Sequence, residues 1–285
     1  MLIHRLLTAL LGIPLVAFLV HSGGYFFVAT ILLLAGIAFF ELKSIFAKKN
    51  VDIYLSNIFF VLLLCVVAFY YNDSAKVFLL FVFGVLCVLL QGILAHKQKK
   101  WQEKNLYSLF TLCYIGLFFS LFILLRQFDM DNSVITAVGS MNKGEVYFWL
   151  CLLGTWASDT FAYFAGTALG KHKLCPAISP NKSWEGAIAG FIGCIISVNI
   201  LNVYVFDINH GVSSVIGLID IDIFFISIFI AFFAPFGDLI ESQLKRNFAV
   251  KDSGSIFPGH GGVLDRLDSL LLVIPIVYIY LNFAR

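Results

Sequence analysis

The sequence predicts an all-α, polytopic integral membrane protein with about nine transmembrane helices and a cytoplasmic N-terminus. Hydrophobic residues make up 60% of the 285 residues and charged residues only 13%, whereas soluble domains typically contain about 25% charged residues. The apolar residues form long runs that do not alternate with polar ones, which indicates helices rather than strands. The net charge of +2 gives no indication of a nucleic-acid partner. None of the six cysteines belongs to a CxxC pair, so they predict no metal or disulfide framework.

A helix needs about 20 mostly apolar residues to cross the bilayer core, and nine stretches of the chain approach this length. They cover residues 3–20, 25–42, 53–71, 76–95, 106–125, 146–169, 186–206, 221–244 and 267–283. The first stretch resembles a signal peptide, because Arg5 precedes an apolar run. It lacks a clear A-x-A cleavage pattern, however, and a second apolar stretch follows almost at once. We therefore expect it to be retained as the first helix.

The basic residues of the loops predict the orientation of these helices. With a cytoplasmic N-terminus, 15 of the 19 Lys and Arg residues lie on the cytoplasmic side and 4 on the other. Omitting one span would spoil this asymmetry, which therefore supports both the number of helices and their orientation. It also places the two most polar loops of the C-terminal half, residues 170–185 and 245–266, on the same cytoplasmic side.

A charged side chain within a membrane span costs at least a few kcal/mol and usually faces a cavity or a partner. Asp159 lies well inside the predicted span 146–169, and Tyr163 follows one helical turn later on the same stripe. The aspartate could pair with a basic residue for purely structural reasons. Because the polar stripe leads to a basic loop, we interpret it as one wall of a polar site.

The segment 179–186, SPNKSWEG, is expected to begin the next helix at Ser183. Pro180 is tolerated at a helix start. The free N–H groups of a first helical turn attract anions, and Lys182 adds a cation there. The same residues are also compatible with an ordinary capped helix that carries a lysine on the cytoplasmic side.

A polar face prolongs the apolar span 221–244. Counted from Asp238, the residues Glu241, Ser242 and Lys245 follow after 3, 4 and 7 positions, so all four share one face of a helix. A surface helix would present such a face to solvent. Because this one continues a membrane span, we interpret it as part of a site.

Residues 251–269, KDSGSIFPGHGGVLDRLDS, interrupt two strongly apolar stretches. Glycines let backbone N–H groups approach a ligand closely, and nests of such groups beside Lys and Arg suit a polyphosphate. Asp265 and Asp268 are hard oxygen ligands for Mg²⁺, which usually takes one or two carboxylates plus substrate phosphates. Together these residues indicate Mg²⁺-dependent chemistry on a phosphate-bearing lipid, with a cytosolic nucleotide as co-substrate.

Residues 242–268, SQLKRNFAVKDSGSIFPGHGGVLDRLD, resemble the signature of phosphatidate cytidylyltransferases, also called CDP-diacylglycerol synthases. The fixed positions of that signature match Ser242, Lys245, Arg246, Lys251, Asp252, Gly254, Pro258, His260, Gly261, Gly262, Asp265, Arg266 and Asp268. The upstream segments SDTFAYFAG, SPNKSWEG and GDLIES also resemble this family, whereas the N-terminal half is similar only in being a set of apolar spans. The resemblance implies the reaction CTP + phosphatidate → CDP-diacylglycerol + pyrophosphate, and a homodimer. The distribution of basic residues places the site on the cytoplasmic face, and the absence of an organelle-targeting extension favours the cell membrane (inner or plasma) of a bacterium.

The resemblance also implies roles for individual residues. The implied catalytic residues are Asp238, Asp265, Lys245, Arg246 and His260. The implied metal ligands are Asp238 and Asp265, followed by Asp268 and Asp159, for Mg²⁺ with Mn²⁺ as a substitute and a second cation such as Mg²⁺ or K⁺. The implied substrate contacts are Ser179, Lys182, Ser183, Glu185, Tyr163, Glu241, Ser242, Lys251, Asp252, Gly261, Gly262 and Arg266. His260 would either shuttle a proton or serve in binding or in ordering the loop. We favour the second role, because a phosphate monoester oxygen is already largely ionised near neutral pH.

The two halves of the chain are expected to have different roles. Residues 1–145 are expected to supply about five scaffold helices that also mediate dimerisation, and residues 146–285 to form the catalytic region of about four helices.

Three other functions are compatible with the sequence. A related lipid enzyme, either a cytidylyltransferase for an ether lipid or a CTP-dependent polyprenol kinase, would use the same metal and nucleotide, and a kinase would release CDP. A transporter or channel would use Asp159 and Asp238 as an ion path. Transporters often show repeats in their two halves, however, and here the polar residues are concentrated in the C-terminal half. An inactive homologue that serves as a structural subunit is the third alternative.

Overall fold

The computed structural model of the chain describes residues 2–206, 221–256 and 261–283, and for residues 2–11 it describes the backbone only. The chain forms two compact units. Unit 1 consists of Met1–Leu124 and Leu244–Leu267, and unit 2 of Leu125–Gln243 and Asp268–Arg285. A segment of the C-terminal half, residues 244–267, therefore belongs to the same unit as the N-terminal helices. The predicted assignment of a scaffold to 1–145 and of catalysis to 146–285 concerns roles, and it stays a prediction.

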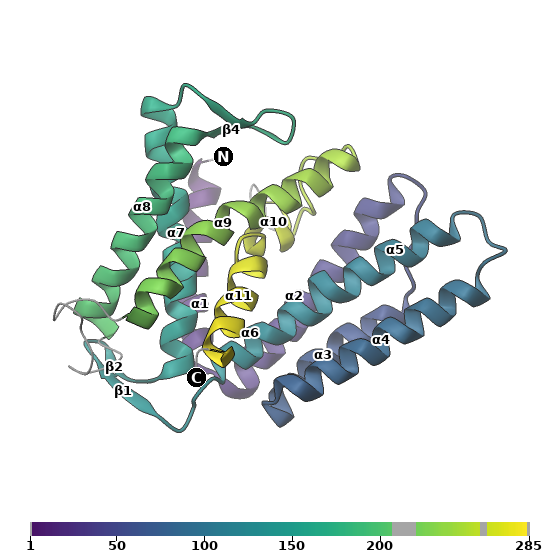
Figure 1. Ribbon diagram of the computed structural model, residues 1–285, viewed down its shortest axis with the longest axis horizontal. Helices are drawn as coiled ribbons and strands as arrows, with labels where there is room; N and C mark the ends of the chain where they lie inside the picture. Colours follow the sequence, from purple (N-terminus) through teal and green to yellow (C-terminus); the bar gives the residue numbers. More distant parts are fainter. Residues whose placement is uncertain (1, 207–220, 257–260, 284–285) are drawn as a thin grey trace. The chain divides into compact units, whose positions relative to one another are not determined.

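Unit 1 is built of helices. They are α1 (Leu2–Ser22), α2 (Gly24–Ala47), α3 (Ser56–Tyr71), α4 (Ser74–Leu94), α5 (Trp101–Thr111), the π-helical segment η1 (Leu112–Leu117) and most of α6 (Phe118–Arg126) (Figure 1). Helix α3 packs against α2, α4 and η1. Gly116 of η1 allows this close approach, because a Cβ at this position would lie 3.0 Å from Leu64 and 3.4 Å from Val61 of α3.

An aromatic cluster holds the segment 244–267 in unit 1. Phe46 of α2 stacks on Tyr107 of α5 with ring centroids 4.6 Å apart. Phe248 packs against both rings, at 5.1 Å from Phe46 and 5.4 Å from Tyr107. Phe46 and Phe248 are buried, so the aromatic contacts fix the start of the signature segment, residues 242–268. This segment ends with the short helix α10 (Leu264–Leu267).

Unit 2 combines helices with two short hairpins. Its elements are β1 (Ser133–Thr136), β2 (Gly139–Asn142), α7 (Lys143–Leu169), β3 (Lys173–Cys175), β4 (Ser179–Ser183), α8 (Trp184–Leu201), η2 (Asn202–Phe206), most of α9 (Ile221–Asn247) and α11 (Leu270–Phe283). Helices α7 and α8 lie side by side along much of their length (Figure 1). Glycines permit this packing: a Cβ at Gly186, Gly190 or Gly193 of α8 would lie within 3 Å of an atom of α7, and small residues commonly allow such close helix contacts in membranes.

A helix covers most of each of the nine ranges that were predicted to span a membrane. Among the described residues, five helices are long and apolar enough to cross one: Gly24–Ala47, Ser74–Leu94, Trp101–Arg126, Trp184–Phe206 and Ile221–Asn247. The 27-residue α7 is not among them, because Asp159 and the neighbouring hydroxyl side chains lower its hydropathy. The helical integral membrane class is confirmed, while the number of nine spans and the cytoplasmic N-terminus stay predictions.

The two hairpins were not predicted. Strands β1 and β2 pair antiparallel with Thr136 opposite Gly139, and β3 and β4 pair with Lys173 opposite Ser183. Their strands have three to five residues, which is too short for the period-two pattern that identifies a strand in a sequence. They pair the polar backbone groups of two loops that connect apolar helices, and such groups rarely stay unpaired where water is scarce.

Candidate active site

The predicted site residues gather in two groups, one in each unit. In unit 2, Asp159, Lys182 and Asp238 form a group that we call the lysine–aspartate cluster. In unit 1, Lys245 and Asp265 contact further polar residues of the signature segment, and we call this group the loop network.

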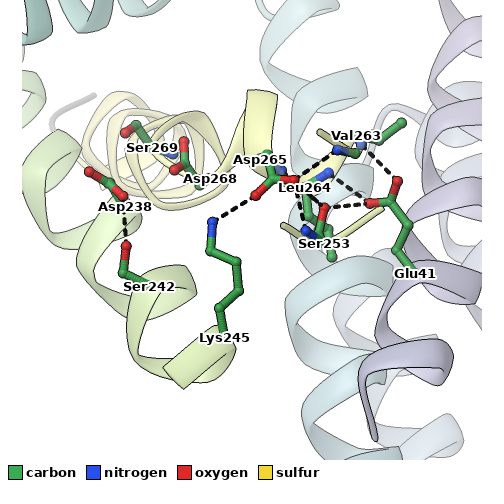
Figure 2. A network of polar contacts seen from close by, with 11 residues as sticks. Glu41, Asp238, Ser242, Lys245, Ser253, Val263, Leu264, Asp265, Asp268 and Ser269 are labelled. Carbon is green, nitrogen blue, oxygen red and sulfur yellow. Dashed lines mark hydrogen bonds and ion pairs between the residues drawn. The ribbon is translucent and has the colours of Figure 1, made fainter. Parts of the chain in front are cut away.

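Lys182 and Asp238 form the centre of the lysine–aspartate cluster. Lys182 lies in β4, and its Nζ is 2.8 Å from Asp238 Oδ2 and donates to Pro235 O of α9 at 3.1 Å. Ser242, one turn further along α9, donates to Asp238 Oδ1 at 3.1 Å (Figure 2). The side chains of Lys182 and Asp238 are 24% and 35% exposed, so a ligand can still reach them.

Two more predicted metal ligands lie beside this pair in unit 2. Asp159 of α7 is close enough to Asp238 and Lys182 for their charges to interact. The backbone of Asp268 packs directly on α9, because a Cβ at Gly237 would lie 2.5 Å from Asp268 O. Three of the four predicted metal ligands therefore lie around Lys182 or the adjoining part of α9.

The start of α8 is the capped helix end that the sequence predicted. Ser183 is the N-cap residue, and its Oγ accepts a hydrogen bond from Gly186 N at 3.2 Å. Glu185 accepts a hydrogen bond from His172 N at 3.2 Å, and its Oε1 lies 2.6 Å from His172 Nδ1. These contacts fit the alternative of an ordinary capped helix for Ser183 and Glu185, while anion binding at this end stays a prediction.

Asp265 connects three parts of the loop network (Figure 2). Lys245 Nζ, at the end of α9, lies 2.6 Å from Asp265 Oδ1. The other oxygen, Oδ2, accepts hydrogen bonds from Ser253 N at 2.8 Å, Ser253 Oγ at 2.9 Å and Gly262 N at 2.8 Å. The side chains of Lys245 and Asp265 are only 14% and 7% exposed, so water screens their interaction weakly.

These contacts set the charge of Asp265. Burial raises the pKa of its carboxyl group, but hydrogen bonds from Lys245, Gly262 and Ser253, together with the positive charge of Lys245, outweigh burial. The net effect holds the pKa of Asp265 below its ordinary value. The carboxylate is therefore ionised near neutral pH, the form that binds cations.

Two glycines of the signature make room for carboxylates. Gly261 has a φ of +82°, a left-handed conformation that favours glycine, and a Cβ there would overlap Asp265. A Cβ at Gly262 would overlap Glu41 and Ser253. The N–H of Gly262 faces the Asp265 carboxylate, so the nest for a polyphosphate expected at these glycines stays a prediction.

Glu41 and Ser253 were not predicted as site residues. Glu41 lies near the C-terminal end of α2 and is 6% exposed. Its Oε1 accepts a hydrogen bond from Val263 N at 2.8 Å, and its Oε2 accepts from Leu264 N and Ser253 Oγ, each at 3.0 Å. A lone acidic residue at the end of an apolar span was the available signal. Ser253 gave none, because it is not a fixed position of the signature.

The other predicted residues differ in their exposure to solvent. Tyr163, Arg246, Lys251, Asp252 and Arg266 are exposed, Ser179 is half-buried in β4, and Glu241 is fully buried in α9. Burial means that Glu241 could contact a substrate only if its neighbours moved. His260 lies outside the described residues.

The metal prediction can be compared with the available donors. Among the described residues, no three His, Cys, Asp or Glu side chains converge closely enough to hold a metal ion by themselves. Mg²⁺ commonly takes one or two carboxylates and completes its coordination with substrate phosphates and water. The lysine–aspartate cluster fits that smaller requirement, because Asp159 and Asp238 interact electrostatically and Asp238 already binds a cation, the Lys182 ammonium.

Comparison with known proteins relates nearly the whole chain to one family. The model of the Cytidylyltransferase family matches residues 3–284. The phosphatidate cytidylyltransferase of Bacillus subtilis (strain 168) is 33% identical over 282 residues, which cover 98% of this chain and 97% of that protein. The phosphatidate cytidylyltransferase of Staphylococcus aureus (strain COL) is 38% identical over 175 residues, covering 61% of this chain and 58% of that protein. The corresponding protein of Staphylococcus saprophyticus subsp. saprophyticus is 42% identical over 140 residues, covering 49% of this chain and 50% of its own.

These matches confirm the resemblance seen in the signature and extend it to the N-terminal helices, where the sequence analysis had found only apolar spans. Because the family model covers nearly the whole chain, the chain belongs to the cytidylyltransferase family and is a nucleotidyltransferase.

Proposed function

We propose that the protein catalyses the reaction CTP + phosphatidate → CDP-diacylglycerol + pyrophosphate. The observation that carries this proposal is the similarity to the Bacillus subtilis phosphatidate cytidylyltransferase over 98% of the chain. The polar residues support it, because both substrates are anions and each unit presents lysine and aspartate side chains in contact.

The chemistry requires one P–O bond to form and another to break. A phosphate oxygen of phosphatidate attacks the α-phosphorus of CTP, the bond from the α-phosphorus to the bridging oxygen breaks, and the electron pair leaves with pyrophosphate. The attacking oxygen is largely ionised near neutral pH, so the reaction needs no general base. The protein must instead bring two anions together and offset the negative charge that develops on the leaving group.

Lys182 is the residue of unit 2 that we assign to a phosphate group. Contacts with Asp238 Oδ2 and Pro235 O hold its ammonium in place, so little side-chain freedom remains to be lost when a phosphate binds. In unit 1, the exposed side chains of Arg246, Lys251 and Arg266 are assigned to further phosphate oxygens. Arginine can bind such oxygens with two parallel hydrogen bonds.

The proposed cofactor is Mg²⁺, with Mn²⁺ as a substitute and a second cation such as Mg²⁺ or K⁺. Asp238 and Asp159, with Asp268 beside them, would hold it in unit 2, and Asp265 is the candidate ligand in unit 1. A bound divalent ion would neutralise phosphate charge and polarise the reacting P–O bonds. For Asp265, the chain's own contribution is to keep the carboxylate ionised and oriented through Lys245 and Ser253.

We further propose that the protein acts in the cell membrane, the inner or plasma membrane of a bacterium, with its site on the cytoplasmic face, as a homodimer. The fifteen-to-four distribution of basic residues supports the cytoplasmic face, where CTP is available. The dimer rests on the family resemblance alone.

A labelling experiment tests the reaction. The chain purified in detergent receives phosphatidate, Mg²⁺ and CTP labelled with ³²P at either the α- or the γ-phosphate. We expect α-label in the lipid fraction and γ-label in pyrophosphate. Asp238→Asn should abolish the transfer. Asp52→Asn should leave it unchanged and serves as the control, because Asp52 is 59% exposed and its contacts are a long ion pair with Lys43, at 3.8 Å, and a local hydrogen bond from Ile53 N that asparagine can also accept.

The other outcomes identify the alternatives. If γ-label enters the lipid, the protein is a CTP-dependent lipid kinase. If neither label enters any lipid in the presence of Mg²⁺ or Mn²⁺, the proposal is wrong, and a transporter or an inactive homologue explains the intramembrane carboxylates better.

A further inference from the structure

Glu41 is a buried residue of the N-terminal half whose carboxylate accepts hydrogen bonds from the signature segment, residues 242–268. It lies in α2, 212 residues before Ser253 and 222 before Val263. Three hydrogen bonds of 2.8 to 3.0 Å reach its two oxygens, from Ser253 Oγ, Val263 N and Leu264 N (Figure 2). A buried carboxylate is costly unless such donors compensate it, so the partners fix one another's positions.

The contact reaches backbone groups that need an acceptor. Val263 and Leu264 lie at the start of α10, where the first N–H groups of a helix have no partner within the helix. Oε1 of Glu41 accepts the first of these N–H groups and Oε2 the second. Glu41 therefore sets where the chain turns into the helix that carries Asp265.

Two glycines make this contact possible. A Cβ at Gly254 would lie 2.6 Å from Glu41 Oε1, and a Cβ at Gly262 would overlap the same oxygen. Both residues belong to the signature that identifies the family in this sequence. Because these two glycines lack a side chain, the signature backbone in unit 1 can lie directly against the Glu41 carboxylate.

Ser253 links Glu41 to Asp265. Its Oγ lies 3.0 Å from Glu41 Oε2 and 2.9 Å from Asp265 Oδ2. A hydroxyl group has a single proton, so Ser253 donates to one carboxylate at a time. Each carboxylate keeps its backbone donors in either case, namely Val263 N and Leu264 N for Glu41 and Ser253 N for Asp265, among others.

We propose that Glu41 is a positioning residue for cytidylyl transfer: from α2 it holds the signature backbone at Ser253 and at Val263–Leu264, and thereby orients the Asp265 carboxylate. This inference rests on the proposed function, in which Asp265 is a catalytic group. It makes one helix of the presumed scaffold a necessary part of the active site, although Glu41 itself contacts no substrate.

Glu41→Gln tests the contact with almost no change in shape. Glutamine has one acceptor oxygen, so its amide nitrogen must face either Val263 N–H or Leu264 N–H, and one backbone hydrogen bond is lost in both orientations. We expect kcat to fall about 10- to 100-fold, which corresponds to losing a hydrogen bond to a charged group, with little change in KM for phosphatidate. Glu103→Gln is the control, because Glu103 is 51% exposed and its ion pair with Lys100 is long, at 3.8 Å.

Gly254→Ala tests the same contact without removing the charge. The new methyl group would overlap Glu41 Oε1, so the carboxylate and the backbone must separate. We expect the same fall in kcat. Because both substitutions break one contact, the double variant should be little worse than either single variant. Independent destabilisation by the two changes would instead multiply their effects.

Hydrogen–deuterium exchange of the peptide that covers residues 250–267 provides a readout that does not depend on activity. We expect faster exchange there in Glu41→Gln and in Gly254→Ala, with melting temperatures and oligomeric state near those of the wild type. Unchanged exchange, or faster exchange with unchanged kcat, would overturn the proposal. If the wild type transfers no label at all, the proposed function fails, and the exchange data still decide whether Glu41 holds the loop. If Glu41→Gln does not fold, Gly254→Ala carries the test.

Discussion

Replacing Lys182 by Met separates two roles of the Lys182–Asp238 pair, one in holding β4 against α9 and one in catalysis. Methionine keeps most of the length and apolar volume of lysine and loses the ammonium group. Two unit charges 2.8 Å apart attract each other by about 6 kcal/mol at an effective dielectric constant of 20. The side chains are 24% and 35% exposed, however, and pairs screened by water contribute only about 0–1 kcal/mol after desolvation and side-chain entropy are included.

The two roles therefore predict very different magnitudes. The free energy of unfolding should fall by at most about 1 kcal/mol. If the ammonium stabilises charge on a phosphate in the transition state, its loss should cost roughly 3–4 kcal/mol, or about 10²- to 10³-fold in kcat. Lys182→Arg keeps the charge with a different geometry, and we expect it to retain intermediate activity.

Initial rates of CDP-diacylglycerol formation and thermal melting of the detergent-purified protein measure both quantities. Lys143→Met is the matched control, because Lys143 forms an ion pair of similar length, 3.0 Å, with Asp129, and the two side chains are 21% and 18% exposed. A catalytic role of the ammonium is refuted if Lys182→Met keeps kcat within about threefold of the wild type, a change of less than 1 kcal/mol. It is also refuted if the rate falls only in proportion to the fraction of unfolded protein.

Three more predictions follow from the contacts. Because the pKa of Asp265 is lowered in the folded protein, its ionised form stabilises the fold above the pKa of the unfolded chain, and this stability is lost as the pH falls through the folded pKa. Lys245→Met should therefore shift the acid-induced fall in melting temperature to higher pH. If melting temperature falls over the same pH range in both proteins, Lys245 does not lower the pKa of Asp265. Arg126 and Glu145 are buried, with Nη2 and Oε2 3.4 Å apart, so Arg126→Met should cost about 3–5 kcal/mol in unfolding free energy and the double variant with Glu145→Gln clearly less. A loss in the double variant equal to the sum of the two single losses would show that the pair is not coupled. Chelation with EDTA should abolish transfer and excess Mg²⁺ should restore it, whereas activity that persists in EDTA excludes the metal proposal.

The sequence predicted what depends on local pattern. Long apolar runs located the helices, because a span needs about 20 apolar residues. Ser183 was placed correctly at the start of α8, since N-cap preference is a local property. The polar stripe of Asp238, Glu241, Ser242 and Lys245 does lie in one helix. Lys182 and Asp238 were both named as site residues, but nothing in the sequence showed that they form an ion pair across 56 residues.

What the sequence could not predict depends on distant contacts. The role of Glu41 depends on hydrogen bonds from Val263 and Leu264, more than 220 residues away. Hydrophobic periodicity carries no information about such a contact. The glycines around His260 were interpreted as letting backbone N–H groups approach a polyphosphate, which stays a prediction. Nothing in the sequence showed that Gly254 and Gly262 make room for the Glu41 carboxylate. Hairpin strands of three to five residues were missed because they are shorter than the pattern that identifies strands.

The membership of residues 244–267 in unit 1 has a consequence for biosynthesis. Roughly 140 residues separate Leu124 from Leu267, so at about 5–20 residues per second a ribosome needs roughly 7 to 30 s to supply the segment that completes the unit. Throughout this interval α2 is present and the backbone donors of Val263 and Leu264 do not yet exist. The Glu41 carboxylate therefore lacks its described donors until the C-terminal part of the chain has been made, and a chain truncated before Ser253 never acquires them. Unit 1 can thus be completed only late in synthesis, although most of its helices are made first.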